Sequence, residues 1–140
     1  MAESQGVKNK EKIITVRPDV ELMSRQSLPY FIGISEQSAG ATGLSMNLIV
    51  IPPGGAADPH LHRGSETAIY VLEGSVQTFY GPDLKESTIN LTGDFIFIPA
   101  DVPHQPVNLS RTEPAKAIVA RNDPNEQESV EPYPNADRRH

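Results

Sequence analysis

Three histidines in the middle of the chain have a spacing that suits a metal site. His60 and His62 are two residues apart, which on an extended chain directs both rings to the same side, and Glu66 follows soon after. His104 comes later, near the start of another apolar segment. Imidazole nitrogens with one carboxylate suit Mn, Fe, Co, Ni, Cu or Zn, whereas calcium and magnesium prefer oxygen ligands. Taken alone, the pair His60 and His62 could be ordinary loop residues, and His104 could be a hydrogen-bonded structural histidine.

Two sequence motifs frame these residues in a recognisable order. The first spans residues 54–74 and ends in TAIYVLEG, and the second spans residues 93–108 with the sequence GDFIFIPADVPHQPVN. Together they resemble the two motifs of the cupin superfamily. The resemblance covers residues 54–108 and implies a small jelly-roll barrel with one divalent metal ion inside, such as Mn, Fe, Ni or Zn. The metal ligands that it implies are His60, His62, Glu66 and His104.

The chain departs from the family pattern at two places. Asp101 stands where the second motif usually has glycine, and a loop Asp tolerates unusual φ values. The interval from Glu66 to Gly74 is one residue longer than usual, so that counting back from Gly74 leads to Thr67. Adjacent strand residues face opposite sides. Either a bulge near Glu66 restores its inward direction, which we favour because bulges are common beside sites, or the site has three histidines and water.

The elements that must position this site are predicted to be short strands. Thirteen prolines and ten glycines in 140 residues interrupt the chain too often for long helices. The pattern of short strands and turns predicts an all-β sandwich or closed barrel, and the resemblance to cupins implies a single-domain jelly-roll barrel of antiparallel strands with little helix. The predicted strands are Ile13–Val16, Tyr30–Ser35, Leu44–Ile51, Ala68–Leu72, Ser75–Tyr80, Ser87–Leu91, Phe95–Ile98, His104–Asn108 and Ala115–Arg121.

The barrel is expected to occupy residues 13–121, between two segments of different composition. Residues 1–12 are polar and are predicted to be flexible. Residues 122–140 form a proline-rich tail. This tail either packs loosely or is anchored by Val130 and Tyr133, to the barrel or to a second subunit.

The composition excludes several classes of function. There is no cysteine, which excludes thiol nucleophiles and cysteine zinc sites and fits a reducing cytosol. The net charge of −6 comes without a dense basic cluster, so no nucleic-acid surface is expected. No apolar segment approaches the roughly 20 residues of a membrane helix, and no secretory signal is apparent. We therefore expect a soluble, cytoplasmic protein. We also expect a homodimer, because unpaired barrel edges seek partners and the resemblance to small cupins, which usually form dimers, implies one.

Two further side chains are candidates for contacts with a ligand. If Glu66 points inward, strand alternation places Tyr70 on the same face, where its hydroxyl could orient a metal-bound water; we predict Tyr70 as a catalytic residue. Arg121, at the end of the last strand, could offer a carboxylate-binding fork, although a solvated charge is the simpler interpretation.

Three functions are compatible with these residues. Open metal positions could bind a small organic molecule and make the protein a dioxygenase with iron, or an isomerase or decarboxylase with Mn, Zn or Ni. The chain could instead be a non-enzymatic metal-dependent binding or sensory domain. A third possibility is an epimerase-like cupin that uses a histidine base without metal. The fold does not choose among them.

Overall fold

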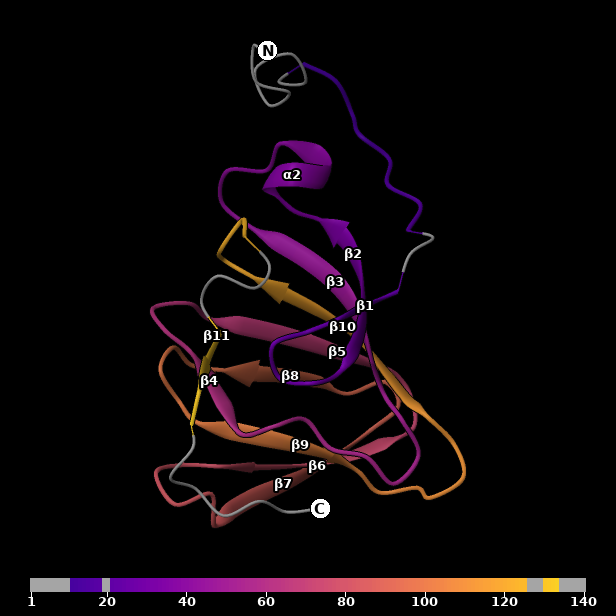
Figure 1. The fold of residues 1–140 in the computed structure, drawn as a ribbon, viewed down its shortest axis with the longest axis vertical. Coiled ribbons are helices and arrows are strands. Elements are labelled where there is room, and N and C mark those ends of the chain that lie inside the picture. The colour runs from indigo at the N-terminus through magenta and orange to yellow at the C-terminus, as the bar shows by residue number, and fades with distance from the viewer. Residues whose placement is uncertain (1–10, 19–20, 126–129, 134–140) are drawn as a thin grey trace.

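The described part of the chain is built almost entirely of strands (Figure 1). The structure is a computed structural model that describes residues 11–18, 21–125 and 130–133. The elements are β1 (Leu22–Met23), β2 (Pro29–Ile34), the one-turn helix α2 (Glu36–Ala39), β3 (Ser45–Ile51), β4 (His60–His62), β5 (Thr67–Glu73), β6 (Ser75–Tyr80), β7 (Glu86–Leu91), β8 (Phe95–Ile98), β9 (His104–Asn108), β10 (Ala115–Arg121) and β11 (Val130–Pro132).

These strands form two antiparallel sheets. The larger sheet has the strand order β1-β2-β3-β10-β5-β8, and the smaller has the order β11-β4-β9-β6-β7. The chain crosses repeatedly between the sheets, as in a jelly roll, but hydrogen bonds do not join the described strands into a closed barrel. The predicted all-β jelly-roll class is confirmed. Figure 1 shows β2, β3, β10 and β5 of the larger sheet above β9, β6 and β7 of the smaller one.

Eight of the nine predicted strands are present, with ends shifted by one residue at most. The exception is the segment 13–16, which forms no strand, and Ile13 is 98% exposed. A short β-branched run becomes a strand only when another strand pairs with it, and none of the described strands does so here. The sequence analysis also missed β1, β4 and β11, which are only two or three residues long.

The core lies between the two sheets. Ile51 and Ala115 from the larger sheet meet Val76 from the smaller one, and Leu28 and Ala57 complete the buried cluster.

The turn between β5 and β6 requires glycine. Gly74 has φ +93°, and a Cβ atom at this position would lie 3.0 Å from the Cα atom of Ala115. A side chain at this position would therefore be strained by its backbone conformation and crowded by β10.

A strand within the predicted C-terminal tail packs against the metal-site strand. β11 pairs antiparallel with β4, with Val130 opposite His62. Val130 is buried, and the hydroxyl of Tyr133 donates a hydrogen bond to the carbonyl of Pro82 at 2.7 Å. The segment therefore covers the outer edge of β4.

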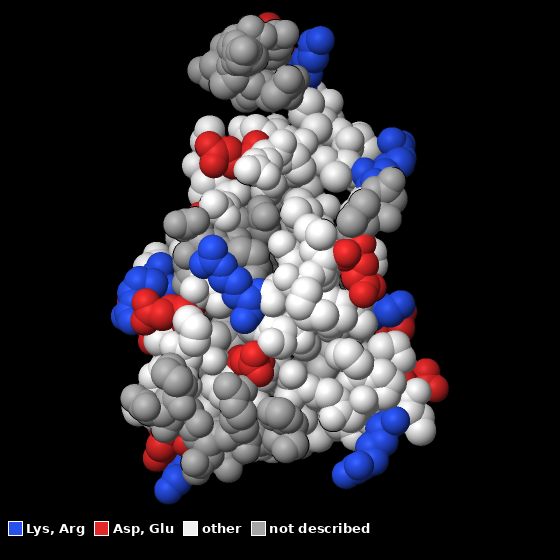
Figure 2. Space-filling model, viewed as in Figure 1, with Lys and Arg blue, Asp and Glu red and all other residues white. Residues whose placement is uncertain are grey.

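The surface carries mixed charges. On the face drawn in Figure 2, acidic and basic side chains are interspersed among the described residues, and no broad basic area forms there. Within the described ranges, every helix is too short to cross a lipid bilayer.

Candidate metal centre

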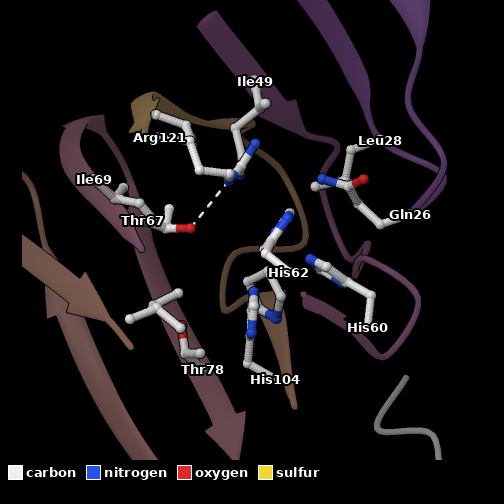
Figure 3. A pocket seen from close by; sticks show the side chains of 13 residues that line it. Gln26, Leu28, Ile49, His60, His62, Thr67, Ile69, Thr78, His104 and Arg121 are labelled. Carbon is white, nitrogen blue, oxygen red and sulfur yellow. Dashed lines mark hydrogen bonds between the residues drawn. The ribbon is translucent and has the colours of Figure 1, made fainter. Parts of the chain in front are cut away.

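Neighbouring strands bring the three histidines together. His60 and His62 lie on β4 and point to one side because strand side chains alternate. β4 pairs with β9 so that His60 stands directly opposite His104. The ring centroids are 4.3 Å apart for His60 and His104, 5.1 Å for His60 and His62, and 5.5 Å for His62 and His104. Figure 3 shows all three imidazoles in one cavity.

The three rings have the geometry of a ligand set. One nitrogen from each lies within 4.8 Å of the others. Three nitrogens bound to one ion in a tetrahedral arrangement lie about 3.4 Å from one another when each metal–nitrogen bond is roughly 2.1 Å. Binding a single ion therefore requires the rings to move closer together than in this structure.

Hydrogen bonds orient two of the rings. Nδ1 of His60 donates to the carbonyl of Asp58 at 2.7 Å, and Nδ1 of His104 donates to the carbonyl of Val102 at 2.9 Å. A carbonyl oxygen can only accept, so Nδ1 carries the proton and the lone pair of a neutral ring lies on Nε2. Metal-binding histidines are commonly held in this way. Nδ1 of His62 is buried without a hydrogen-bond partner.

Burial keeps all three rings neutral. It lowers the pKa of His104 to about 4, partly opposed by the hydrogen bond to Val102. Burial and the neighbouring His104 hold the pKa of His60 well below 6.5, and burial together with the nearby Arg121 cation lowers the pKa of His62 strongly. At neutral pH, protons therefore do not compete with a metal ion for these nitrogens.

Glu66 lies outside this group. It precedes β5, is exposed, and its backbone N–H donates to the Asn122 side chain. The inward position at the start of β5 belongs to Thr67, the residue reached by counting back from Gly74. Thr67 and Val71 are buried on the inner face, and no bulge turns Glu66 toward the imidazoles. Among the described residues, the group contains three histidines and no carboxylate.

Tyr70 lies on the outer face of the larger sheet. Because β5 alternates from Thr67 inward, Tyr70 points away from the cavity, and its ring packs against Phe95 with centroids 4.8 Å apart. Phe95 and Phe97 share this outer face, whereas Ile98 is buried, as the alternation of their strand predicts.

Arg121 is buried, contrary to the interpretation made from the sequence. Its side chain is only 7% exposed, so the expectation of a solvated charge is wrong. Its position opposite Thr67 in the β10–β5 ladder turns the side chain inward, where Nε donates to the Thr67 hydroxyl at 3.0 Å. Burial lowers the pKa of Arg121 to about 10, so that the guanidinium remains charged at neutral pH. Figure 3 shows it extending toward His62.

The cavity around these groups is small. Its volume, measured as the space open to the centres of water-sized groups, is about 30 Å³, more than the roughly 10 to 15 Å³ that one water molecule needs. Two polar residues at its wall, Gln26 and Thr78, were not predicted from the sequence. Thr78 lies at an inward position of β6, whereas Gln26 belongs to a polar segment without any recognisable motif. The lining residues are Gln26, Leu28, Ile49, His60, His62, Thr67, Ile69, Thr78, Ile98, His104, Pro106, Val119 and Arg121.

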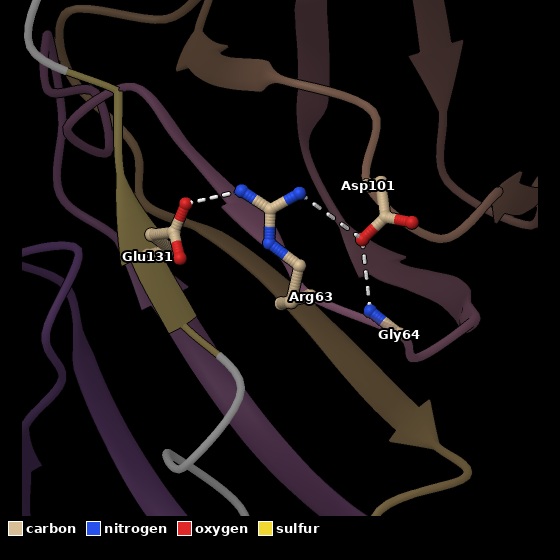
Figure 4. Close-up of polar contacts among 4 residues, drawn as sticks. All are labelled: Arg63, Gly64, Asp101 and Glu131. Atoms are coloured by element: carbon tan, nitrogen blue, oxygen red, sulfur yellow. Dashed lines mark hydrogen bonds and ion pairs between the residues drawn. The ribbon is translucent and has the colours of Figure 1, made fainter.

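Asp101 stabilises the turn that follows the histidine pair (Figure 4). It has φ +68°, the left-handed conformation that its replacement of glycine predicts. Its backbone N–H donates to the carbonyl of His62 at 3.1 Å, and its carboxylate accepts from the N–H of Gly64 at 2.9 Å. Arg63 lies between this carboxylate and that of Glu131, which connects the turn to β11.

The fold and the histidine group together define a double-sheet jelly roll with an internal group of three histidines that could hold a metal ion. Residues 47–121 match the family model described as the cupin domain. Because this match covers more than half of the sequence, the chain belongs to the cupin family. The resemblance inferred from the two motifs is thereby confirmed. No curated protein matches the sequence.

Several solved structures share the fold. An oxalate decarboxylase from Lactobacillus farciminis in complex with formate has a TM-score of 0.68 and 20% identity, covering 81% of this chain and 33% of that one. The Bacillus subtilis oxalate decarboxylase, studied for its Mn(II) centres, has a TM-score of 0.64 and 16% identity, covering 74% of this chain and 28% of that one. A recombinant oxalate oxidase in complex with glycolate has a TM-score of 0.61 and 23% identity over 73% and 54%. The chain thus spans about a third of the first enzyme.

Proposed function

We propose that His60, His62 and His104 bind one divalent metal ion, and that the protein uses this centre to bind and convert a small organic anion. The observation that carries the proposal is the presence of Arg121 in the same small cavity as three neutral imidazoles. A bound divalent ion would supply a Lewis-acid centre with open positions for ligand oxygen atoms.

The charge of such a site favours an anion. Three neutral imidazoles leave the double positive charge of the ion uncompensated, and Arg121 adds one more positive charge. Among the described residues, the histidine group contains no carboxylate that would offset the charge of the ion, whereas Asp123 offsets part of the charge of Arg121. A planar guanidinium pairs well with a carboxylate, and charges interact strongly in a buried cavity. We therefore propose a small carboxylate as the ligand.

The donor set and the related structures narrow the proposal. Imidazole ligands suit iron, nickel and zinc, whereas manganese usually accompanies carboxylates, so we propose Fe, Ni or Zn ahead of Mn. The structural neighbours include enzymes named for oxalate that were solved with formate or glycolate. Decarboxylation or oxidation of a small organic acid is the corresponding proposal for this chain.

One observation favours a second candidate, a non-enzymatic metal-dependent binding protein. If all three histidines bind the ion, the polar side chains that remain at the cavity wall are Gln26, Thr67, Thr78 and Arg121. None of these four is a good proton acceptor at neutral pH, so the cavity has no evident general base.

The test is metal analysis followed by binding and turnover measurements. We expect one metal ion per chain after purification without added metal, and calorimetric binding of formate, glycolate or oxalate only to the metal-containing protein. Oxygen uptake or carbon dioxide release on a panel of organic acids, catechols and diketones then separates an enzyme from a binding protein. Failure to bind a metal, or equal anion binding by the metal-free protein, would contradict the proposal.

We also propose that the protein is a homodimer formed through the outer face of the larger sheet. Phe95 is 81% exposed and Phe97 61%, and Tyr70, Leu72 and Met46 are exposed on the same face. Large exposed apolar areas mark interaction sites. Two copies of a chain with net charge −6 repel each other least where they meet through uncharged side chains, as they would on this face.

Replacing Phe95 by glutamate is expected to separate this dimer, because a charge would be buried in the interface. Light scattering should give twice 15.3 kDa for the wild type and 15.3 kDa for the variant. Ile89→Glu, which changes an exposed residue of β7 in the other sheet, is the matched control and should remain dimeric. A monomeric wild type, or a dimeric Phe95→Glu variant, would exclude this interface.

A further inference from the structure

Gln26 is a buried polar residue whose side chain has no partner. It is 5% exposed, lies between β1 and β2, and lines the cavity with the three histidines. Its Oε1 atom makes no hydrogen bond within the described part of the chain. Buried amide groups are nearly always hydrogen-bonded, and an exception calls for a missing partner. Figure 3 shows Gln26 on one side of the cavity and Arg121 with Thr67 on the other.

The segment that carries Gln26 is fixed relative to the metal site. The backbone N–H of Asp58 donates to the carbonyl of Gln26 at 2.8 Å, and the Ser27 hydroxyl donates to the Asp58 carboxylate at 2.6 Å. The carbonyl of the same Asp58 accepts the Nδ1 proton of His60. Asp58 therefore fixes both the backbone of Gln26 and the ring of His60, so that the Gln26 side chain extends from a defined position at the cavity wall.

The missing partner must be able to form a hydrogen bond with the side-chain amide of Gln26. An amide has a donating and an accepting end, and half a turn of the group exchanges them. A hydroxyl group both donates and accepts, so it can match the amide in either orientation. A carboxylate of the same ligand would face Arg121 across the cavity. The small volume of the cavity restricts such a ligand to a few heavy atoms.

We propose that Gln26 determines the specificity of the site for a small 2-hydroxy carboxylate, by hydrogen-bonding its hydroxyl group while Arg121 binds its carboxylate. The inference rests on the proposed metal-dependent anion binding. It also adds a functional residue from outside the matched cupin segment, 47–121.

The experiment compares glycolate with acetate, which has the same carbon skeleton but lacks the hydroxyl group. In titration calorimetry with metal-containing protein, the wild type should bind glycolate at least about 10-fold more tightly than acetate. Gln26→Leu should lose this preference, with acetate affinity changed less than about twofold. Its metal affinity should also remain unchanged, since Gln26 is not among the ligand histidines.

Two controls test whether a lost preference for glycolate reflects the specificity of the site or a folding defect of the variant. Gln37→Leu removes an exposed glutamine of α2 and should retain the preference for glycolate. The melting temperature of metal-free Gln26→Leu should equal or exceed that of the wild type, because the variant removes an unsatisfied buried group.

The outcomes distinguish this inference from the proposed function. Equal binding of the two anions by the wild type, or an equal loss of both in Gln26→Leu, would overturn the role of Gln26 and leave metal-dependent anion binding intact. Binding of neither anion by the metal-containing wild type would overturn both.

Discussion

Replacing His62 by alanine is expected to lower the affinity for a divalent metal ion by more than about 100-fold. Changes to residues that only support metal ligands already cost 10- to 100-fold, and His62 is itself one of the proposed ligands. The variant is a clean test, because Nδ1 of His62 has no hydrogen-bond partner, whereas Nδ1 of His60 and of His104 donates to the backbone. Competition with a chromophoric chelator measures the Kd directly.

Thermal unfolding provides a second measurement of the same loss. A ligand present at 100 times its Kd stabilises the folded state by about 2.7 kcal/mol. The wild type should therefore melt at a clearly higher temperature with added metal. His62→Ala should show almost no such shift, and its metal-free melting curve reports whether it folds.

Glu66→Ala is the matched control for the ligand set. Glu66 is exposed and outside the histidine group, so its loss should change the metal affinity less than about twofold. If Glu66→Ala weakens metal binding as much as His62→Ala, the carboxylate is a fourth ligand and the three-histidine proposal fails. Unchanged affinity in His62→Ala would remove the metal site altogether.

Replacing Arg121 by glutamine should weaken anion binding to the metal-containing protein by at least about 30-fold. Loss of one member of a buried, hydrogen-bonded charge pair costs roughly 2 to 5 kcal/mol, and each 1.4 kcal/mol is a factor of ten in Kd. Arg121 is buried and remains charged, so its pair with a bound anion would be a buried charge pair of this kind. Calorimetric titration with glycolate and with formate measures the effect.

Two further variants identify the cause of that loss. Arg121→Lys preserves the charge without the planar guanidinium, so its affinity should lie between those of the wild type and Arg121→Gln. Arg111→Gln removes an exposed arginine and should leave anion binding unchanged, because exposed charges are screened. Equal anion affinity in the wild type and Arg121→Gln, with metal still bound, would show that Arg121 does not contact the ligand.

The parts of the site that the sequence predicted correctly depend on local geometry. His60 and His62 point to one side because strand side chains alternate, and this needs no knowledge of the remaining chain. The eight confirmed strands follow from the same alternation and from turn residues such as Gly74. Asp101 adopts the positive φ expected from its substitution for glycine.

The residues that the sequence placed differently, or missed, depend on long-range contacts. Gln26 reaches the cavity only because its segment hydrogen-bonds to Asp58, which lies far along the chain. β11 forms against β4 although its three residues carry no strand pattern of their own. The sequence offered Val130 and Tyr133 as possible anchors of the C-terminal segment, but nothing in the local composition of either segment identifies β4 or Asp58 as the partner.

β5 shows where prediction from the sequence ends and tertiary structure decides. Its phase, meaning which of its alternating residues face the core, is the property in question. The sequence by itself determined that two histidines share one face, that the chain forms short strands, and that residues 66 and 67 face opposite ways. Tertiary structure alone decided that Thr67 is the inward residue, since the pairing of Thr67 with Arg121 and Ile98 sets which face of β5 is buried. Alternation is a property of a single strand, whereas its phase is a property of the sheet.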